Sequence, residues 1–331
     1  MAKISIAMTT YNGEKYVEKQ LLSLLNQTRK ADEVIIRDDC STDKTAEIVT
    51  EFIKKNSLKN WDFSVNKCNL GYKSNFYEAI SQTTGDIIFL CDQDDIWYLN
   101  KLEVMESVFN NNPSVKALNS SFEFIDQQDN KIQFIDKRGT SNKNLIDIQI
   151  PADALYKINT NIILRRNISP GCVCAYTREV CNKFIKHTKN SLPHDWELNI
   201  YAASMNGLYF YNSSLTRYRI HENNAIGMKI DNQMELKIKG NRLVRRQVLS
   251  EQRALADLFA SDWIYKTLSK HEKNTALIFQ EYIKNREICI DRFNLIAYLK
   301  LCLAYPFLRQ ISSISFRSLI GDFIYMSKIK R

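Results

Sequence analysis

Residues 1–125 alternate between short apolar runs of β-strand character and longer amphipathic helical patterns. The predicted strands are Ile4–Met8, Glu33–Arg37, Trp61–Val65 and Asp86–Leu90. The predicted helices are Tyr16–Leu25, a segment capped by Ser41 or Thr42, Asn75–Ile80 and Leu99–Phe109. This alternation is typical of a mostly parallel sheet covered by helices, so the sequence predicts an α/β fold. Ligands of such sheets bind at the carboxyl ends of the strands.

The pattern changes twice further along the chain. Residues 122–168 contain many Asn, Asp and Lys residues and are predicted to be irregular, with a strand near Ile132–Ile135. SLPHDWELNIYAA predicts a loop leading into a helix, and GLYFYNSSLTRYRIHENN predicts two short strands and a loop. Long helical patterns follow beyond Lys229. We therefore expect an α/β domain over residues 1–228 and a helical C-terminal extension over residues 229–331.

The balance of charge suggests an anionic partner. The chain has 331 residues, a formal net charge of +9 and a pI near 9.0, which suits nucleic acid, a membrane surface or a phosphorylated substrate. None of its nine glycines forms a GxGxxG or GxxxxGKS/T motif, so a bound nucleotide must be held in another manner. Its eight cysteines form no CxxC pair, and we expect free thiols in a reducing cytosol.

The two ends of the chain bear on where it acts. The start, MAKISIAMTTYNG, is too short and polar for a signal peptide, so a cytoplasmic location is expected. No run reaches the roughly 18 apolar residues of a membrane span, and the best candidate, Leu295–Leu308, is interrupted by Lys300 and Pro306. Residues 291–331 carry seven Lys/Arg and two Asp/Glu among aromatic residues. That composition suits a membrane surface or a helical bundle packed on the first domain.

The stretch CDQDDIW places three carboxylates, Asp92, Asp94 and Asp95, directly after the apolar run that ends at Leu90. Like charges this close raise one another's pKa unless a cation or several donors compensate. Mg²⁺ and Mn²⁺ take carboxylate oxygens and keep open positions for phosphate oxygens. The stretch therefore predicts either a metal site or a solvated loop that caps the helix beginning near Leu99.

Polar residues also follow the first two predicted strands. In TTYNGEKY, the Thr9 hydroxyl and the Tyr11 ring could receive a flat base, or the segment could be a polar turn. Asp39, at the end of the second strand, could accept a hydrogen bond from a base imide or a ribose hydroxyl. The alternative for Asp39 is capping of the following helix, where negative charge is favoured.

Two later residues complete the candidates. Asp195 follows Pro193 at the start of a helix, where it could serve as a general base or cap the helix. His221 lies near Arg217 and Arg219, so a neutral imidazole could ligate a metal and the arginines could meet phosphate. The alternative for His221 is an ordinary surface histidine.

Seven segments occur in an order and at spacings that resemble the inverting family 2 glycosyltransferases of GT-A fold. They are SIAMTTYNGEKY, VIIRDDCSTDKT, NKCNLGYKSNF, GDIIFLCDQDDIW, SPGCVCAY, PHDWELNIYA and LTRYRIHENN. The resemblance covers residues 2–228, and CDQDDIW and HDWELN are most similar to the bacterial rhamnosyltransferase branch, which builds surface polysaccharides. It implies a nucleotide-sugar-binding fold with a mostly parallel central sheet flanked by helices.

The resemblance also implies which residues meet the donor. Those that match positions contacting the nucleoside are Thr9, Tyr11 and Asp39. Those that match the segment beside the donor phosphates and sugar are Asn69, Gly71, Lys73 and Asn75.

The same resemblance implies a metal site and a catalytic base. Asp92 and Asp94 match the DxD motif, and His221 matches a histidine that completes the coordination of Mn²⁺ or Mg²⁺. Asp95 is expected to support the loop or touch the sugar. Asp195 occupies the position of the base, although the residue before it is a histidine where related enzymes usually have an acid.

The sequence thus predicts a metal-dependent inverting glycosyltransferase. It would move a sugar from dTDP-rhamnose or a UDP-hexose to a growing, lipid-linked surface polysaccharide, in contact with the inner face of the cell membrane. A nucleotidyltransferase acting on sugar phosphates is the alternative enzyme. Such enzymes usually have a first loop rich in glycine and Lys/Arg, which TTYNGEKY is not. A nucleic-acid-binding protein is the alternative outside enzymes, and the acidic clusters speak against it. The oligomeric state is not predicted.

Overall fold

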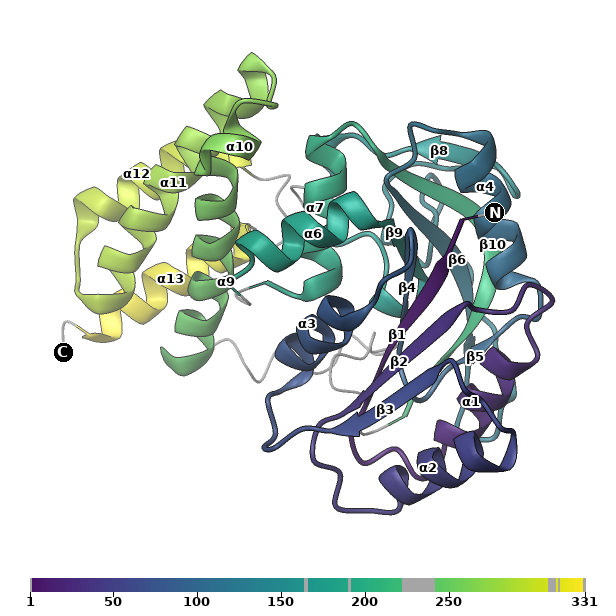
Figure 1. The fold of residues 1–331 in the computed structure, drawn as a ribbon. Coiled ribbons are helices and arrows are strands. Elements are labelled where there is room, and N and C mark those ends of the chain that lie inside the picture. The colour runs from purple at the N-terminus through teal and green to yellow at the C-terminus, as the bar shows by residue number, and fades with distance from the viewer. Residues whose placement is uncertain are drawn as a thin grey trace. The chain divides into compact units, whose positions relative to one another are not determined.

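The computed structural model describes residues 2–163, 166–189, 192–221, 242–308, 314 and 316–329. The chain divides into two compact units, one of residues 1–159 and 167–228 and the other of residues 160–166 and 229–331. The first unit contains the sheet and the second is helical (Figure 1).

In the described part of the first unit, ten strands form one mixed sheet. The strands are β1 (Ile4–Thr10), β2 (Glu33–Asp38), β3 (Trp61–Val65), β4 (Ile87–Cys91), β5 (Ile96–Trp97), β6 (Ala117–Ile125), β7 (Lys131–Ile132), β8 (Leu155–Lys157), β9 (Cys174–Thr177) and β10 (Leu208–Arg219). Their order is β3-β2-β1-β4-β9-β6-β10-β5, with β7 paired to β6 and β8 to β10. Because β3, β2, β1 and β4 run parallel, β1, β2 and β4 end at the same edge of the sheet. The predicted α/β fold is confirmed.

Strand β1 is the centre of the parallel part and is buried along its whole length. Its register pairs Ile6 with Val34 of β2 and with Phe89 of β4. Parallel strands covered on both faces have nearly continuous apolar sequences, and in ISIAM the buried Ser5 is the one polar residue. Alternate side chains of a strand point to opposite faces, so Ile4, Ile6 and Met8 share one face and enter the same hydrophobic cluster.

Helices cover both faces of this sheet (Figure 1). Those whose apolar residues join the Ile4–Met8 cluster are α1 (Val17–Leu25), α2 (Thr45–Lys55) and α4 (Lys101–Asn111). Those on the other face are α3 (Tyr72–Gln82), α6 (Arg178–His187) and α7 (His194–Ser204), near the one-turn helix η1 (Gly171–Val173). The predicted cap of α2 was misplaced, because its N-cap is Lys44 and the Ser41 hydroxyl instead donates to Asp38 Oδ2 at 2.6 Å.

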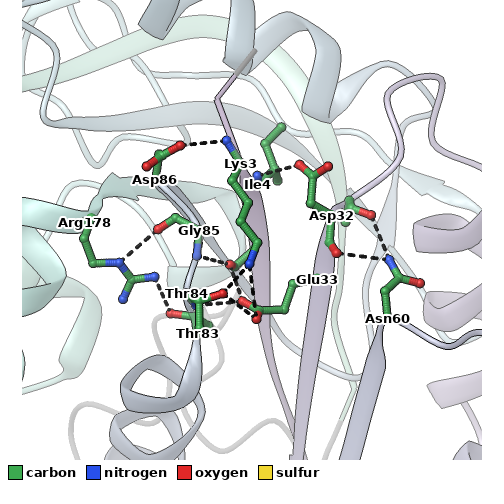
Figure 2. Close-up of polar contacts among 12 residues, drawn as sticks. Lys3, Ile4, Asp32, Glu33, Asn60, Thr83, Thr84, Gly85, Asp86 and Arg178 are labelled. Carbon is green, nitrogen blue, oxygen red and sulfur yellow. Dashed lines mark hydrogen bonds and ion pairs between the residues drawn. The ribbon is translucent and has the colours of Figure 1, made fainter.

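The amino-terminal edge of the parallel strands is closed by polar contacts (Figure 2). Lys3 N donates to Asp86 Oδ2 at 2.8 Å, and Thr84 N donates to Glu33 Oε2 at 2.7 Å. At Gly85 the chain passes so close to β1 that a Cβ would lie 2.7 Å from the Lys3 carbonyl oxygen. These carboxylates bind backbone and side-chain groups of neighbouring strands, so this edge maintains the strand register.

Two strands differ from the sequence prediction. β6 runs through a segment predicted to be irregular beyond residue 122, and its polar residues Asn119, Ser120 and Ser121 are buried. Asn119 Nδ2 donates to Asn199 Oδ1 of α7 at 3.0 Å, so a buried amide is satisfied without an apolar neighbour. The prediction of two strands in GLYFYNSSLTRYRI was wrong, because β10 is one strand with register shifts between Tyr211 and Ser214 and between Ser214 and Arg217.

The described helices of the second unit are α5 (Thr160–Ile163), α9 (Arg242–Ala260), α10 (Asp262–Tyr265), α11 (Lys270–Asp291), α12 (Leu295–Leu308) and α13 (Phe316–Ile329). A buried ion network joins α9, α11 and α13, since the carboxylate of Asp322 binds both Arg245 and Arg286. None of the described helices is both long enough and apolar enough to cross a membrane.

Candidate active site

Three loops meet at the carboxyl ends of β1, β2 and β4, and their side chains bind one another's backbones. The Gln93 amide, after β4, accepts a hydrogen bond from Tyr11 N and donates one to Tyr11 O, each at 2.8 Å. Asn12 N donates to Ser41 Oγ at 2.8 Å, which joins the loop after β1 to the loop after β2. Gly13 permits the approach of Gln93, since a Cβ there would lie 2.1 Å from Gln93 Oε1.

Asp39 and Asn75 hold the loop that follows β3. Asp39 accepts hydrogen bonds from Leu70 N at 2.7 Å and from Gly71 N at 2.8 Å. Gly71 has a φ of +78°, a conformation that favours glycine. Asn75 is 2% exposed, and its Oδ1 accepts a hydrogen bond from Asn66 Nδ2 at 2.9 Å. Asn75 therefore binds this loop from inside, and its place beside the donor stays a prediction.

The more open candidates of this region are Tyr11, Asn69 and Lys73. The Tyr11 side chain is 48% exposed, while Thr9 lies inside the end of β1. Asn69 is exposed, and Lys73 is half-buried at the start of α3. Burial lowers the pKa of His194, and the charge of Lys73 lowers it further, to about 3. The starts of α3 and α7 therefore lie close together.

The carboxylates of CDQDDIW separate into two groups. Asp92 and Asp95 lie beside Cys172 of η1, and one ligand atom from each of the three lies within 4.8 Å of the others. Asp94 Oδ2 lies 2.8 Å from His221 Nε2, two residues beyond β10. Burial, followed by the charge of Asp94, raises the pKa of Asp92 well above its usual value and that of Asp95 to about 7.

Arg219, the last residue of β10, holds the loop of Asp94 and Asp95 by hydrogen bonds. It is fully buried, its N donates to Asp95 Oδ1 at 2.9 Å, and its Nε donates to the Asp94 carbonyl oxygen at 2.7 Å. The Tyr16 ring lies 4.7 Å from the guanidinium carbon and 5.0 Å from the His221 ring. Asp95 thus joins this loop to the end of β10, while its predicted roles, support of the loop or contact with the sugar, stay predictions.

Asp195 is the second residue of α7 and is held by two hydrogen bonds. Its Oδ1 accepts from Trp196 N and its Oδ2 accepts from Asn167 Nδ2, both at 2.8 Å. Burial raises the pKa of Asp195 to about 6, although both hydrogen bonds lower it. The charge of Asp195 also raises the pKa of Asp92, so the predicted base and the acidic cluster belong to one site.

The residues predicted to bind a metal are Asp92, Asp94 and His221. Their ligand chemistry fits a divalent cation such as Mg²⁺ or Mn²⁺. Asp92 and Asp94 offer carboxylate oxygens, which both ions prefer, and the His221 imidazole suits Mn²⁺ better than Mg²⁺. Cys172 offers a soft thiol sulfur, which neither ion prefers as a ligand. The donor set is therefore one of oxygen and nitrogen.

Comparison with known proteins identifies the family. The pattern of "Glycosyl transferase family 2" matches residues 5–169. The chain is also 32% identical over 269 residues to the dTDP-rhamnosyl transferase RfbG of Shigella flexneri, covering 76% of this chain and 85% of that protein. The chain belongs to glycosyl transferase family 2. It is a glycosyltransferase, and the alternative enzyme class is set aside.

Further relatives agree with this family and with the GT-A fold. The glycosyltransferase is 31% identical over 147 residues to the poly(ribitol-phosphate) beta-N-acetylglucosaminyltransferase TarS of Staphylococcus aureus, covering 44% of this chain and 22% of TarS. The crystal structure of TarS 1-349 with UDP-GlcNAc matches at a TM-score of 0.55 and 16% identity, over 98% of this chain and 92% of that one. The structure of the mannosyltransferase PcManGT from Pyrobaculum calidifontis, in complex with GDP-Man and Mn²⁺, matches at a TM-score of 0.52 and 14% identity. The match covers 100% of this chain and 88% of that one.

Lys101 belongs to the glycosyltransferase site but was not predicted from the sequence. It is fully buried at the start of α4, where its Nζ donates to the Cys172 carbonyl oxygen at 2.5 Å and to Thr216 Oγ1 at 2.9 Å. Burial lowers the pKa of Lys101 to about 8, and its charge in turn lowers the pKa of Asp92 and Asp95. A lysine in the first turn of a helix is usually a surface residue, so no sequence signal marks it.

Asn167 is the second residue that sequence reasoning missed, and it carries a prediction about pH. Replacing Asn167 by alanine removes the donor to Asp195 Oδ2 that lowers the pKa of this carboxyl. As the predicted base, Asp195 must be deprotonated to act, so we expect activity to rise as the pH passes upward through the pKa of Asp195. We expect the acidic limb of the pH–rate profile to move to higher pH by about one unit in Asn167→Ala.

The measurement is kcat/KM for sugar transfer between pH 4.5 and 9, with Asn112→Ala as the matched control. Asn112 Nδ2 donates to the Val108 carbonyl oxygen at 2.9 Å at the end of α4, so this change alters helix α4 and not the base. An acidic limb that stays in place in Asn167→Ala would show that Asn167 does not set the pKa of the base.

Proposed function

We propose that this glycosyltransferase moves a sugar from a nucleotide diphosphate donor to an acceptor hydroxyl with inversion at the anomeric carbon. The catalytic domain would span residues 1–228 and the helical extension residues 229–331. The observation that carries the proposal is the placement of Asp195. Its buried carboxylate, with a pKa of about 6, faces the same site as Asp92. A proton acceptor and an acidic cluster suited to a cation are the two groups that this reaction needs.

The proposed step is a single in-line displacement. Asp195 takes the proton of the acceptor hydroxyl while the hydroxyl oxygen attacks the anomeric carbon. The bond from that carbon to the donor phosphate oxygen breaks, and its electron pair leaves with the nucleoside diphosphate. The hydrogen bonds from Trp196 N and Asn167 Nδ2 fix the orientation of the carboxylate, which leaves its remaining lone pairs for the incoming proton. No covalent enzyme nucleophile takes part.

Asp92, Asp94 and His221 would hold Mn²⁺ or Mg²⁺, and a bound ion would offset the negative charge that the diphosphate acquires as it leaves. The site residues divide the other tasks. Tyr11 is open to stack on the base, and the charge of Lys73 acts on His194 at the start of α7. Thr9 and Asp39 would complete the nucleoside side, with Asn69 and Gly71 on the loop beside the phosphates.

We infer that the donor is dTDP-rhamnose or a UDP-hexose. The relative from Shigella flexneri, a dTDP-rhamnosyl transferase, supports the first, and the UDP complexes of TarS support the second. The acceptor would be a growing surface polysaccharide on a lipid carrier, which places the enzyme in the cytoplasm at the inner face of the cell membrane. Assembly of a surface glycan fits the polymer-directed activity in the name of TarS.

A panel of nucleotide sugars tests this function without knowledge of the acceptor. Hydrolysis of each donor by the full chain is measured with Mn²⁺, with Mg²⁺ and with a chelator. We expect turnover of dTDP-rhamnose or of one UDP-hexose, lost on chelation and restored by Mn²⁺. Formation of a nucleotide sugar from a nucleoside triphosphate and a sugar phosphate, with no donor hydrolysis, would contradict the proposal.

A further inference from the structure

We propose that an exposed apolar ridge on α12 and α13 docks this glycosyltransferase on an anionic membrane surface. The ridge consists of Leu295, Ile296, Leu299, Leu303 and Phe307 of α12 with Phe316, Ile320, Phe323 and Ile324 of α13. The purpose of the ridge, though not its existence, rests on the lipid-linked acceptor proposed above. Docking would keep the enzyme in the layer where such an acceptor lies.

Helix α12 is apolar on both faces. Ala297, Leu301 and Leu308 are buried against the rest of the second unit. The opposite face carries the five α12 residues of the ridge, which are between 50% and 73% exposed. A helix that is hydrophobic all round is found in a core or against lipid, whereas a helix at a water-facing surface has a polar stripe. Apart from the exposed Lys300, whose Nζ lies 3.9 Å from Glu281 Oε1, α12 therefore lacks the charged residues that contact with water alone would favour.

Helix α13 continues the same surface. The Tyr298 ring of α12 lies 5.0 Å from the Phe323 ring, and the Tyr305 ring lies 6.1 Å from the Phe316 ring. These two contacts place the helices side by side (Figure 1). The four α13 residues of the ridge are between 41% and 62% exposed, while Leu319 and Met326 face inward. Large side chains exposed together on adjacent helices form a patch of the kind that marks an interaction site.

The composition of the segment that carries the ridge favours anionic lipid over a second copy of the chain. Residues 291–331 carry seven Lys/Arg and two Asp/Glu. Both acids are bound internally, because Asp322 is buried with Arg245 and Arg286, and Asp291 pairs with Arg246 at 2.6 Å. Two copies of this basic segment repel each other, whereas the negative surface potential of an anionic bilayer attracts Lys and Arg.

The dimensions fit a helix that lies in the membrane plane. The 14 residues of α12 extend over about 21 Å, which is short of the roughly 30 Å of a bilayer core. Tyr298 and Tyr305 lie beside the ridge, and tyrosine rings favour the boundary between lipid and water. An apolar face with flanking basic residues is the pattern of helices that bind at this boundary.

Vesicle flotation of the full chain tests the proposal. The probes are vesicles of phosphatidylcholine alone and vesicles that also contain phosphatidylglycerol. We expect the wild type to float with the anionic vesicles, less at high salt, and weakly with the neutral ones. The double variant Leu299→Glu with Leu303→Glu should lower the partition coefficient by about tenfold or more. Leu277→Glu is the matched control, because Leu277 is 53% exposed on α11, outside the ridge, and this change should have no effect.

Other measurements separate this inference from the proposed function. Leu303→Ser is measured alongside, in case the charged pair unfolds the helices, and it should weaken flotation by about threefold. Donor hydrolysis should stay unchanged in all variants, so a loss of flotation with normal hydrolysis concerns the ridge alone. Absence of hydrolysis in the wild type would count against the proposed function alone.

Three outcomes would overturn the inference. The first is flotation of the double variant as strong as that of the wild type. The second is no flotation of the wild type, with a concentration-dependent dimer in sedimentation that the double variant abolishes, which assigns the ridge to a second copy. The third is no flotation and no dimer, with a lower unfolding temperature in Leu303→Ser, which assigns the ridge to packing within the chain.

Discussion

Replacing Asp195 by asparagine is expected to lower sugar transfer about 10³-fold while donor binding stays within about twofold. The amide has nearly the shape of the carboxyl but cannot take a proton from the acceptor hydroxyl. Because burial raises the pKa of Asp195 to about 6, the ionised carboxylate costs folding free energy at higher pH. Asparagine removes that cost at pH 7.5 and disturbs only one of the two hydrogen bonds, so we expect a folded protein. Transfer is measured with the donor that the hydrolysis panel identifies.

The matched control for Asp195 is Glu197→Gln on the same helix. Glu197 is also buried, and its oxygens accept hydrogen bonds from Tyr201 Oη and Thr188 Oγ1, each at 2.8 Å. Its carboxylate binds groups of the protein, so the same loss of one negative charge there should leave transfer within about threefold. If Asp195→Asn transfers sugar at the rate of the control, another residue is the base.

Replacing Asp94 by asparagine should abolish the response to metal as well as transfer. In the wild type, Mn²⁺ at about a hundred times its Kd should stabilise the fold by about 2.7 kcal/mol, a rise in Tm of several degrees. The variant keeps an acceptor oxygen for His221 Nε2, which lies 2.8 Å from Asp94 Oδ2, so the end of β10 should stay in place. Without the carboxylate we expect most of the Mn²⁺ shift to disappear and transfer to fall about 10²- to 10³-fold.

The matched control for Asp94 is Asp86→Asn, at the opposite end of β4. Asp86 Oδ2 accepts a hydrogen bond from Lys3 N at 2.8 Å, and an amide oxygen can do the same. This variant should keep both the Mn²⁺ shift and the transfer rate. A full Mn²⁺ shift in Asp94→Asn would remove Asp94 from the metal site, and unchanged transfer would remove it from catalysis.

The parallel part of the fold could be predicted because its signals are local. A strand buried on both faces, such as β1, is a continuous apolar run, and α1 shows its core face as Val17, Leu21 and Leu24. β6 escaped prediction because Asn119 and its polar neighbours are buried through partners on other strands and on α7. Such pairing leaves no periodic apolar pattern in the segment itself.

The candidate site also contains residues that could be predicted from the sequence and residues that could not. The acids at strand ends were predicted, because parallel strands bring their carboxyl ends together whatever the intervening sequence. The assignment of Asp39 and Asn75 to the support of the loop after β3 was not predicted, since it depends on which donors that loop presents. No role was assigned from the sequence to Lys101, Asn167 or Cys172, although Cys172 lies in SPGCVCAY, one of the segments that carry the resemblance.

The sequence alone determined the order of strands and helices in the parallel part of the sheet, the strand ends that carry acids, and the family. These depend on residues close together in the chain and on motifs in a set order. Tertiary structure decided which groups meet: His221 lies beside Asp94 across 127 positions, and Lys101 beside Cys172 across 71. It also decided the charge states, because the pKa of Asp195 or Lys101 follows from burial, and burial is a property of the packed chain.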